Sequence, residues 1–221
     1  MAMRSDGLET RGRLLESATE VFVRKGFRDT TVGEICELAG ANVASVNYHF
    51  GGKERLYAAV WKHAFEEAER HYPLDDARDM SLPPRKRLHS LIRSVLSSIL
   101  RHGPQSRSGQ LLLQELSQPN EAIDDVRHET TQPVRDCVFQ IMSELLGPDA
   151  TDMQVRLCIV SVMHQVLAIG FRGGRKPPVY KDQGRFAEHE IDELIEHIYQ
   201  FSLGGVQRIR KLAGRAADDS D

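Results

Sequence analysis

The residues between 44 and 49 carry the side chains with the clearest chemistry in the chain. They combine a methyl group, a hydroxyl, an amide, a phenol and an imidazole within six positions: Ala44, Ser45, Asn47, Tyr48 and His49. Val43, Val46 and Phe50 fall at helical spacing, which predicts that these three are buried and leaves the polar set without a core role. An amide can pair with a base edge, whereas hydroxyl and phenol groups bind phosphate oxygens. These residue types therefore favour contact with nucleic acid.

Two short helices joined by a tight turn are predicted to position this set. Thr31 and Glu34 have the S/T-x-x-E spacing of a capping box at the start of the first helix. Gly40 supplies the left-handed residue that ends this helix, and Asn42 is a good N-cap for the second. Two short helices with a glycine turn between them form a helix-turn-helix, whose second helix fits the major groove of DNA.

The same stretch resembles the recognition region of the tetracycline-repressor (TetR) family. That family's pattern reads roughly A-G-V-S-x-x-x-[LI]-Y-x-H-F-x-x-K-x-x-L. The matching residues run through the turn, the second helix and the start of the next one: Ala39, Gly40, Ala41, Asn42, Val46, Asn47, Tyr48, His49, Phe50, Lys53 and Leu56. The sequence departs from the pattern at Asn47, where the family usually has tyrosine, and the tyrosine follows one place later. This shift makes Asn47 a candidate base-reading residue.

The resemblance implies a dimeric, ligand-responsive transcriptional regulator, most often a repressor, that binds a palindromic operator in double-stranded DNA and is released by a small-molecule effector. The expected phosphate contacts are those of Thr31, Tyr48, His49 and Lys53. The expected contacts with base edges are those of Ala44, Ser45 and Asn47. Asn42 is expected to cap the start of the recognition helix. Residues 109–126 (GQLLLQELSQPNEAIDDV) also resemble the effector domain of the branch often labelled CecR-like or YbiH-like. That resemblance implies a small toxic or drug-like effector.

Composition is that of an ordinary soluble protein. The chain has 221 residues, enough for one large or two modest domains, of which 40% are hydrophobic and 28% charged. Residues 1–63 have a formal charge of +1 and the remainder −4, so charge alone does not predict nucleic-acid binding. The N-terminus has no hydrophobic signal core and no run is expected to span a bilayer, which predicts a cytoplasmic protein without a membrane partner. The three cysteines are expected to be buried and reduced: Cys36, Cys137 and Cys158.

The chain has helical periodicity throughout and no convincing strand pattern, which predicts an all-α fold. After a flexible arm at 1–7, a first helix should end at Gly26, and a long helix from Lys53 to about His71 should join two domains. Further helices are expected at 85–102, 108–117, 131–146, 151–171 and 187–203, the last with an extension toward 212. The expected domains are a DNA-binding helix-turn-helix domain at 1–52, a ligand-binding and dimerisation domain at 53–212, and a disordered tail at 213–221.

The segment 155–169 is apolar on nearly every side, so it needs cover on two faces. Together with the apolar stripe of the next helix, it favours a four-helix interface across a two-fold axis, with a monomer core as the alternative. The expected interface residues are Cys158, Val162, Val166, Ile191, Leu194 and Ile198. Polar residues near the apolar helices are candidate effector contacts, although they could equally be satisfied core or rim groups: Gln110, Gln114, His164, Gln165 and Arg172.

Other clusters give weaker signals. His189, Glu193, Glu196 and His197 fall near one helical face but lack the H-E-x-x-H order, so we predict a solvated acidic face and neither a metal nor another cofactor. The sequence around Gly51-Gly52-Lys53 does not match a phosphate-binding loop, and no catalytic motif is found. The chain is therefore predicted not to be an enzyme. A helical ligand-binding protein with enzymatic activity in its C-terminal domain is the alternative.

Overall fold

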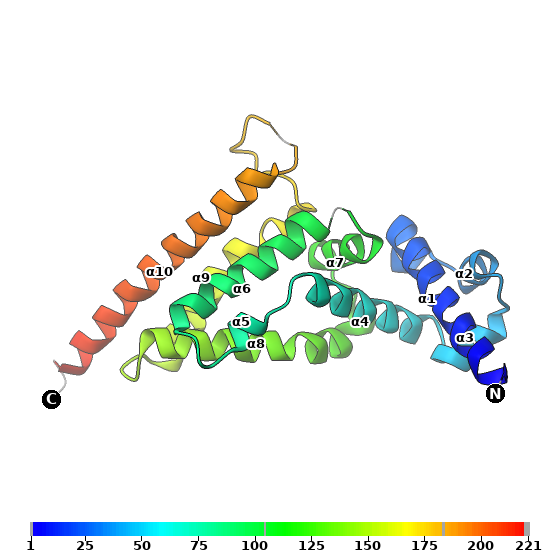
Figure 1. Ribbon diagram of the computed structural model, residues 1–221, viewed down its shortest axis with the longest axis horizontal. Helices are drawn as coiled ribbons and strands as arrows, with labels where there is room; N and C mark the ends of the chain where they lie inside the picture. Colours follow the sequence, from blue (N-terminus) through cyan, green and yellow to red (C-terminus); the bar gives the residue numbers. More distant parts are fainter. Residues whose placement is uncertain (1, 104, 183, 219–221) are drawn as a thin grey trace.

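The computed structural model describes residues 2–103, 105–182 and 184–218, and within these ranges the regular elements are all helices. In the same ranges Arg175 and Arg185 form an isolated antiparallel bridge. The molecule is elongated, with the N-terminal helices at one end and the C-terminal part of the last helix at the other (Figure 1). The predicted all-α class is therefore confirmed.

Three helices form the N-terminal unit: α1 (Ala2–Asp29), α2 (Val32–Ala39) and α3 (Val43–Phe50). α1 is interrupted where expected, at Gly26, because a φ of 77° is readily adopted only by glycine. The expected flexible arm at 1–7 is wrong for residues 2–7, which are helical, and Met1 lies outside the described residues. The core of this unit is aliphatic and aromatic, and it includes Leu14, Phe22, Ile35, Val46 and Phe50.

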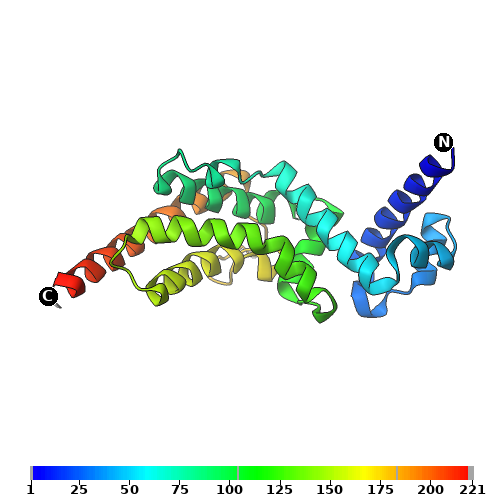
Figure 2. The same ribbon diagram turned by 90° about the horizontal axis from the view of Figure 1, so that it is seen from below.

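α4 (Lys53–His71) joins this unit to the larger domain, as the sequence predicts. Figure 2 shows α4 running from the N-terminal helices into the body of the molecule. Leu56, Tyr57 and Val60 in its first half pack into the N-terminal core. One continuous helix therefore lies in both parts of the protein.

The larger domain is a set of packed helices around an aliphatic core. Its elements are α5 (Asp75–Arg78), α6 (Pro84–Ser97), the π-helical turn η1 (Ser98–His102), α7 (Arg107–Ser117), the 3-10 turn η2 (Glu121–Ile123), α8 (Asp124–Leu146), α9 (Asp152–Leu167), the 3-10 turn η3 (Gly170–Arg172) and α10 (Glu188–Asp218).

Three predicted boundaries in this domain are corrected. α8 begins at Asp124 rather than near residue 131 and continues through Pro133, which is exposed. α9 ends at Leu167, before the expected Phe171. α10 continues through Asp218, so residues 213–218 of the expected tail are helical, and residues 219–221 lie outside the described residues.

Five of the six expected dimer residues are buried inside one protomer, and Leu194 is half-buried. Cys158, Val162, Val166, Ile191 and Ile198 are each at most 8% exposed, and Leu194 packs against the same core. A side chain that its own chain already buries offers almost no surface to a partner. The five buried residues therefore pack in the core of the protomer, which was the alternative interpretation.

The segment around α9 is apolar, as predicted. Asp152–Arg172 has the length and composition of a membrane-spanning helix, whereas the sequence analysis expected no such run. One stripe of this helix, which includes Val155 and Val166, packs into the domain core. The opposite side carries exposed apolar residues, including Leu157 and Val160. The hydropathy of α9 thus reflects two apolar faces, of which the protomer covers one.

Candidate nucleic-acid interface and ligand cavity

The start of α2 is fixed by the predicted capping box. Thr31 Oγ1 accepts a hydrogen bond from the Glu34 N–H at 3.3 Å, and the Glu34 carboxylate accepts one from the Thr31 N–H at 3.1 Å. Lys25 of α1 forms an ion pair with the same carboxylate. The hydrogen bonds from Lys25 and Thr31 lower the pKa of Glu34 to about 2. The cap therefore ties α2 to α1 and leaves Thr31 exposed at the helix N-terminus, where phosphates are favoured.

The turn between α2 and α3 sets the direction of the second helix. Gly40 adopts a φ of 61°, and its N–H bonds back to the last turn of α2. Asn42 caps α3, because its Oδ1 accepts hydrogen bonds from the Ser45 N–H at 2.9 Å and from Ser45 Oγ at 3.1 Å. Asn42 and Ser45 are thus bonded to each other, which favours a capping role for both over direct base contact.

The face of α3 turned away from the core consists of Val43, Ala44, Asn47 and Tyr48. Tyr48 is 85% exposed. The predicted burial of Val43 is wrong, since its side chain is 52% exposed, whereas Val46 and Phe50 are buried as expected. Because apolar side chains contact the thymine methyl group in the major groove, Val43 joins the candidate base contacts. Helical spacing alone could not reveal this role.

His49 and Lys53 flank this face and both make contacts within the protein. The His49 ring is half-buried and packs edge-on against Tyr48, with ring centroids 4.9 Å apart. Lys53 Nζ lies 4.5 Å from the centroid of the Phe27 ring and donates a hydrogen bond to the Arg28 carbonyl at 3.4 Å. Lys53 therefore stabilises the junction of α1 and α4. This junction lies at the edge of the surface where the sequence analysis expected Lys53 to contact a phosphate.

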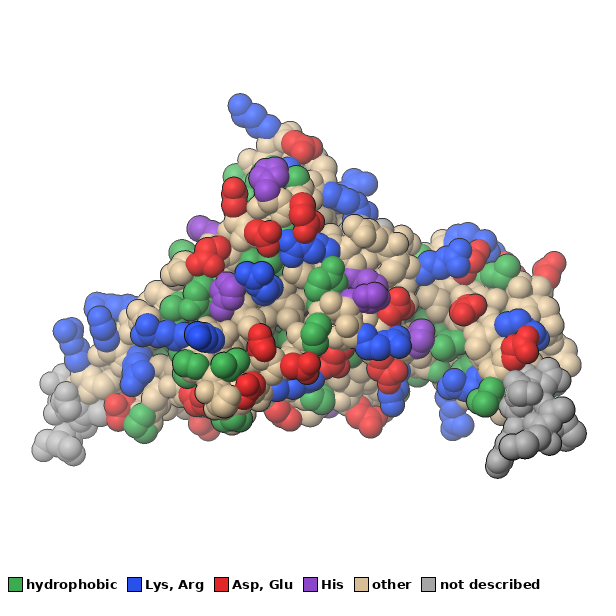
Figure 3. Space-filling view, viewed as in Figure 1, with side chains coloured by type: hydrophobic (Ala, Val, Ile, Leu, Met, Phe, Trp, Pro, Cys, Tyr) green, Lys and Arg blue, Asp and Glu red, His purple; other side chains and the backbone are tan. Residues whose placement is uncertain are grey.

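Charge does not single out the N-terminal unit. Acidic and basic side chains are interspersed over the face of the molecule in Figure 3, including over the N-terminal helices. This distribution agrees with the nearly neutral N-terminal sequence. Recognition of DNA by this unit would therefore depend on the shape and hydrogen-bonding groups of α3 more than on a broad basic surface.

The acidic face of α10 has ordinary surface interactions. Glu196 pairs with the ring of His89 at 3.3 Å, and the His197 ring stacks on Phe201 with centroids 6.2 Å apart. Among the residues that the structure describes, no group of three His, Cys, Asp or Glu side chains is placed to hold a metal ion.

A cavity of about 350 Å³ lies in the larger domain between α4, α6, η1, α7, α8 and α9. Its walls are mainly apolar and include Trp61, Phe65, Ile99, Leu112, Val134 and Met163. The charged side chains of the lining are Glu69, which forms an ion pair with Arg78, and Arg135, which donates to the His128 carbonyl at 2.7 Å. Because these charges are already paired or hydrogen-bonded, the cavity suits an uncharged and largely apolar molecule.

The five expected effector residues lie outside this cavity lining. His164 Nδ1 pairs with the Val160 carbonyl at 2.9 Å, and Gln165 Nε2 donates to the Ser161 carbonyl at 3.0 Å, both within α9. Gln110 and Arg172 are exposed, and the Gln114 amide lies beside Gly26 of α1. The sequence analysis looked for polar contacts near apolar helices, whereas the cavity is lined mainly by apolar side chains.

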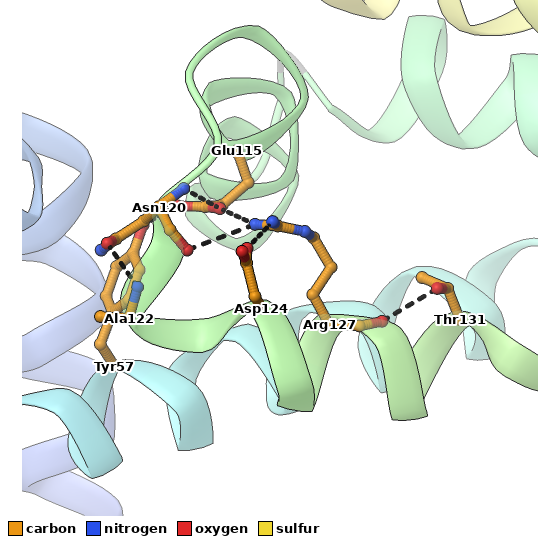
Figure 4. A network of polar contacts seen from close by, with 7 residues as sticks. All are labelled: Tyr57, Glu115, Asn120, Ala122, Asp124, Arg127 and Thr131. Carbon is orange, nitrogen blue, oxygen red and sulfur yellow. Dashed lines mark hydrogen bonds and ion pairs between the residues drawn. The ribbon is translucent and has the colours of Figure 1, made fainter.

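A buried polar network connects α4 to α7 and α8 beside the N-terminal core (Figure 4). Tyr57 Oη donates a hydrogen bond to Glu115 Oε1 at 2.5 Å, and both residues are 2% exposed. Glu115 Oε2 accepts hydrogen bonds from Arg127 Nη1 at 3.0 Å and from the Asn120 N–H at 3.1 Å. Burial, together with the adjacent carboxylate, raises the pKa of the Tyr57 phenol, which keeps it a neutral donor. The sequence analysis missed this network, because its members are far apart in the chain.

These features define a class of protein: a helix-turn-helix unit with an exposed polar and apolar face on its second helix, joined by one helix to an all-α domain that contains an apolar cavity. Residues 14–60 match the family model for bacterial regulatory proteins of the tetR family. Residues 84–206 match the model for the C-terminal domain of the HTH-type transcriptional dual regulator CecR. The chain belongs to the TetR family, and its larger domain is of the CecR type.

Individual proteins are similar to this chain in sequence or in fold. The chain is 27% identical to the HTH-type transcriptional dual regulator CecR of Shigella flexneri over 209 residues, which cover 88% of this chain and 89% of that protein. The transcriptional regulator FadR of Bacillus subtilis, solved with stearoyl-CoA, has a TM-score of 0.64 at 16% identity, covering 87% of this chain and 97% of that one. AibR, solved with isovaleryl coenzyme A and operator DNA, has a TM-score of 0.61 at 19% identity, covering 86% and 98%.

Proposed function

We propose that the protein is a ligand-responsive transcriptional repressor of the cytoplasm. It binds a palindromic operator as a dimer and is released by a small, uncharged and largely apolar effector. One observation carries the proposal: Trp61 of α4 belongs to the core of the DNA-binding unit and also lines the cavity of the larger domain. A ligand in the cavity would therefore contact α4, the same helix that packs against the DNA-binding unit and helps to set the position of α3.

The DNA-binding role is assigned to residues 1–52 and ligand binding and dimerisation to the domain that follows. On α3, Ala44, Asn47 and Val43 approach base edges, while the exposed Tyr48 reaches the phosphate backbone. Two copies of α3 would enter successive major grooves, about one helical turn apart or at a related spacing.

Dimerisation is assigned to the exposed apolar faces of α9 and α10. Leu157 and Val160 of α9 are 56% and 49% exposed, and Phe201 of α10 is 66% exposed. Two copies of this face, related by a two-fold axis, would cover each other and form a four-helix interface. This surface takes the place of the buried residues that the sequence analysis selected.

A matched pair of substitutions on α9 tests this assembly. Val160→Asp places a charge on the exposed face, so we expect a folded monomer with much weaker operator binding. Val162→Asp places the charge at a site that is 2% exposed in the protomer, so we expect a protein that does not fold stably. Light scattering and circular dichroism distinguish the two outcomes. A Val160→Asp protein that remains a wild-type-like dimer would remove α9 from the interface.

The larger domain is proposed to bind its ligand without transforming it. Two of the lining hydroxyls, those of Ser94 and Thr131, donate to the carbonyls of Pro73 and Arg127 at 2.8 Å and 2.9 Å, which makes them structural donors rather than nucleophiles beside a base. The acyl-CoA complexes of FadR and AibR support ligand binding by this fold, and the AibR complex includes operator DNA.

Selection of DNA from a random duplex library tests the function directly. The proposal predicts enrichment of a palindrome, whose affinity falls steeply with salt because phosphate contacts release counterions. A promoter that carries the palindrome should be repressed by the protein in a reporter strain. Recovery of no enriched sequence would contradict the proposal.

A further inference from the structure

Three buried side-chain nitrogens have no hydrogen-bond partner among the residues that the structure describes: Trp61 Nε1, Arg87 Nη2 and Asn120 Nδ2. Two of these side chains are held by their other polar atoms. Arg87 Nε donates to the Ala77 carbonyl at 3.0 Å, and Asn120 Oδ1 accepts from the Ala122 N–H at 3.1 Å. An indole ring has a single polar atom, its N–H. The Trp61 side chain therefore makes no hydrogen bond within the described part of the chain.

Trp61 is also the one of these three residues that lines the cavity. Its side chain is 4% exposed, and its ring lies beside that of Phe65, one turn later on α4, with centroids 6.2 Å apart. A buried donor without an acceptor destabilises a protein, because it has lost its bond to water and gained none in return. Since the described protein atoms supply no acceptor, a molecule in the cavity is the natural source of one.

The other polar groups of the cavity wall do not impose the same requirement on a ligand. The hydroxyls of Ser94 and Thr131 already donate to backbone carbonyls. Ser98 and Tyr72 also belong to the lining, and their hydroxyls can either donate or accept a hydrogen bond. The Trp61 N–H can only donate. Among these groups, it is therefore the one that distinguishes a ligand with an acceptor from a ligand without one.

We propose that the effector is an apolar molecule with a neutral carbonyl group, whose oxygen accepts a hydrogen bond from Trp61 Nε1. Because the nitrogen is buried, the ring of Trp61 or that of Phe65 adjusts when the oxygen binds. A carboxylate is disfavoured, since the Arg135 side chain of the lining is already hydrogen-bonded and an unpaired buried charge is costly. An alcohol brings a donor of its own, which would need a further acceptor. This inference rests on the proposed function, because it requires that the cavity binds the effector.

Nuclear magnetic resonance of the full-length wild type tests the hydrogen bond directly. Trp61 is the single tryptophan of the chain, so a ¹⁵N-labelled sample gives one indole N–H signal. Fluorenone and fluorene are matched probes, because they share a three-ring skeleton and differ by a carbonyl in place of a methylene group. We expect fluorenone to move the indole proton signal downfield relative to its position with fluorene. Neither probe should move it in Val95→Phe, where a larger side chain occupies part of the cavity.

A pair of substitutions measures the contribution of the N–H to affinity. Trp61→Phe keeps an aromatic ring and removes the donor, so calorimetry should show that it raises the Kd for fluorenone about fivefold more than the Kd for fluorene. Phe65→Leu is the matched control, since it changes the same wall without removing a polar group and should alter both Kd values alike. The resonance measurement uses the wild type and so does not depend on the folding of Trp61→Phe.

Two kinds of failure are distinguishable. If fluorenone and fluorene both bind in the cavity and leave the indole proton signal at the same position, the proposed hydrogen bond is overturned. Equal losses of affinity for both probes in Trp61→Phe would overturn it as well. If neither these probes nor the pair of benzophenone and diphenylmethane binds in the cavity, the proposed function is contradicted and the inference falls with it.

Discussion

The recognition surface of α3 and the cavity of the larger domain are built in opposite ways. The recognition surface comes from a short run of the chain, is exposed, and is held by local caps such as the one between Asn42 and Ser45. The cavity is assembled from six elements and has mainly apolar walls. A surface held by local caps can move as a rigid body. The packing around an apolar cavity, by contrast, changes with the volume of whatever fills the cavity. The few groups that join the two regions therefore decide whether one can influence the other.

The largest effect is expected at the buried network that joins the two regions. Glu115→Ala would leave the Tyr57 hydroxyl, Arg127 and the Asn120 N–H without their common acceptor. Arg127 is partly exposed and keeps its ion pair with Asp124, so the cost comes mainly from the buried donors that lose their acceptor. Each such donor typically costs about 1–3 kcal/mol, so we expect the free energy of unfolding to fall by about 3 kcal/mol. Urea denaturation followed by circular dichroism measures this change.

The matched control is Glu121→Ala, which removes an exposed carboxylate from the neighbouring turn η2. This substitution should change the free energy of unfolding by no more than about 0.5 kcal/mol. If Glu115→Ala is equally mild, the network does not hold the two regions together.

An intermediate effect is expected on the recognition surface. Asn47→Ala should cost roughly 1–3 kcal/mol of operator affinity at one base pair and relax specificity there, because asparagine pairs bidentately with adenine. The Kd values of Asn47→Ala and the wild type for a set of single-base operator variants measure both the loss of affinity and the loss of specificity. Tyr48→Phe, which removes the proposed phosphate contact, should instead weaken all variants alike. An unchanged ranking of operators after Asn47→Ala would remove this residue from base reading.

The smallest effect concerns the cap of α2. The pKa of Glu34 is lowered from its ordinary value of 4.5 to about 2 in the folded protein. Its carboxylate therefore stabilises the fold fully above pH 4.5, and this contribution is lost as the pH falls toward 2. Glu34→Gln should lower the urea midpoint at pH 6 and have progressively less effect below pH 4. A difference between the two proteins that stays constant down to pH 3 would contradict this role.

The same contrast explains what could be predicted from the sequence. The helix-turn-helix was predictable because Thr31, Gly40 and Asn42 act on residues a few positions away. Val43 was misplaced because helical spacing marks an apolar residue as buried without showing which neighbours cover it. The sequence also could not show that Cys158, Val162 and Val166 of α9 are buried in the protomer, since a helix that is apolar all round does not show which face its own domain covers. The cavity and the Tyr57–Glu115 bond depend on contacts between distant segments, which local patterns do not encode.

The central claim is that occupancy of the cavity lowers operator affinity, and one titration tests it most directly. The first step selects uncharged apolar compounds that bind in the cavity. Such compounds raise the melting temperature of the wild type but not that of Val95→Phe, in which a larger side chain occupies part of the cavity. The Kd for the operator is then measured with and without a saturating ligand, and the Kd for the ligand with and without operator. The account predicts that the ligand raises the operator Kd about tenfold and that the operator raises the ligand Kd by the same factor. A compound that binds the cavity and leaves the operator Kd unchanged would contradict it.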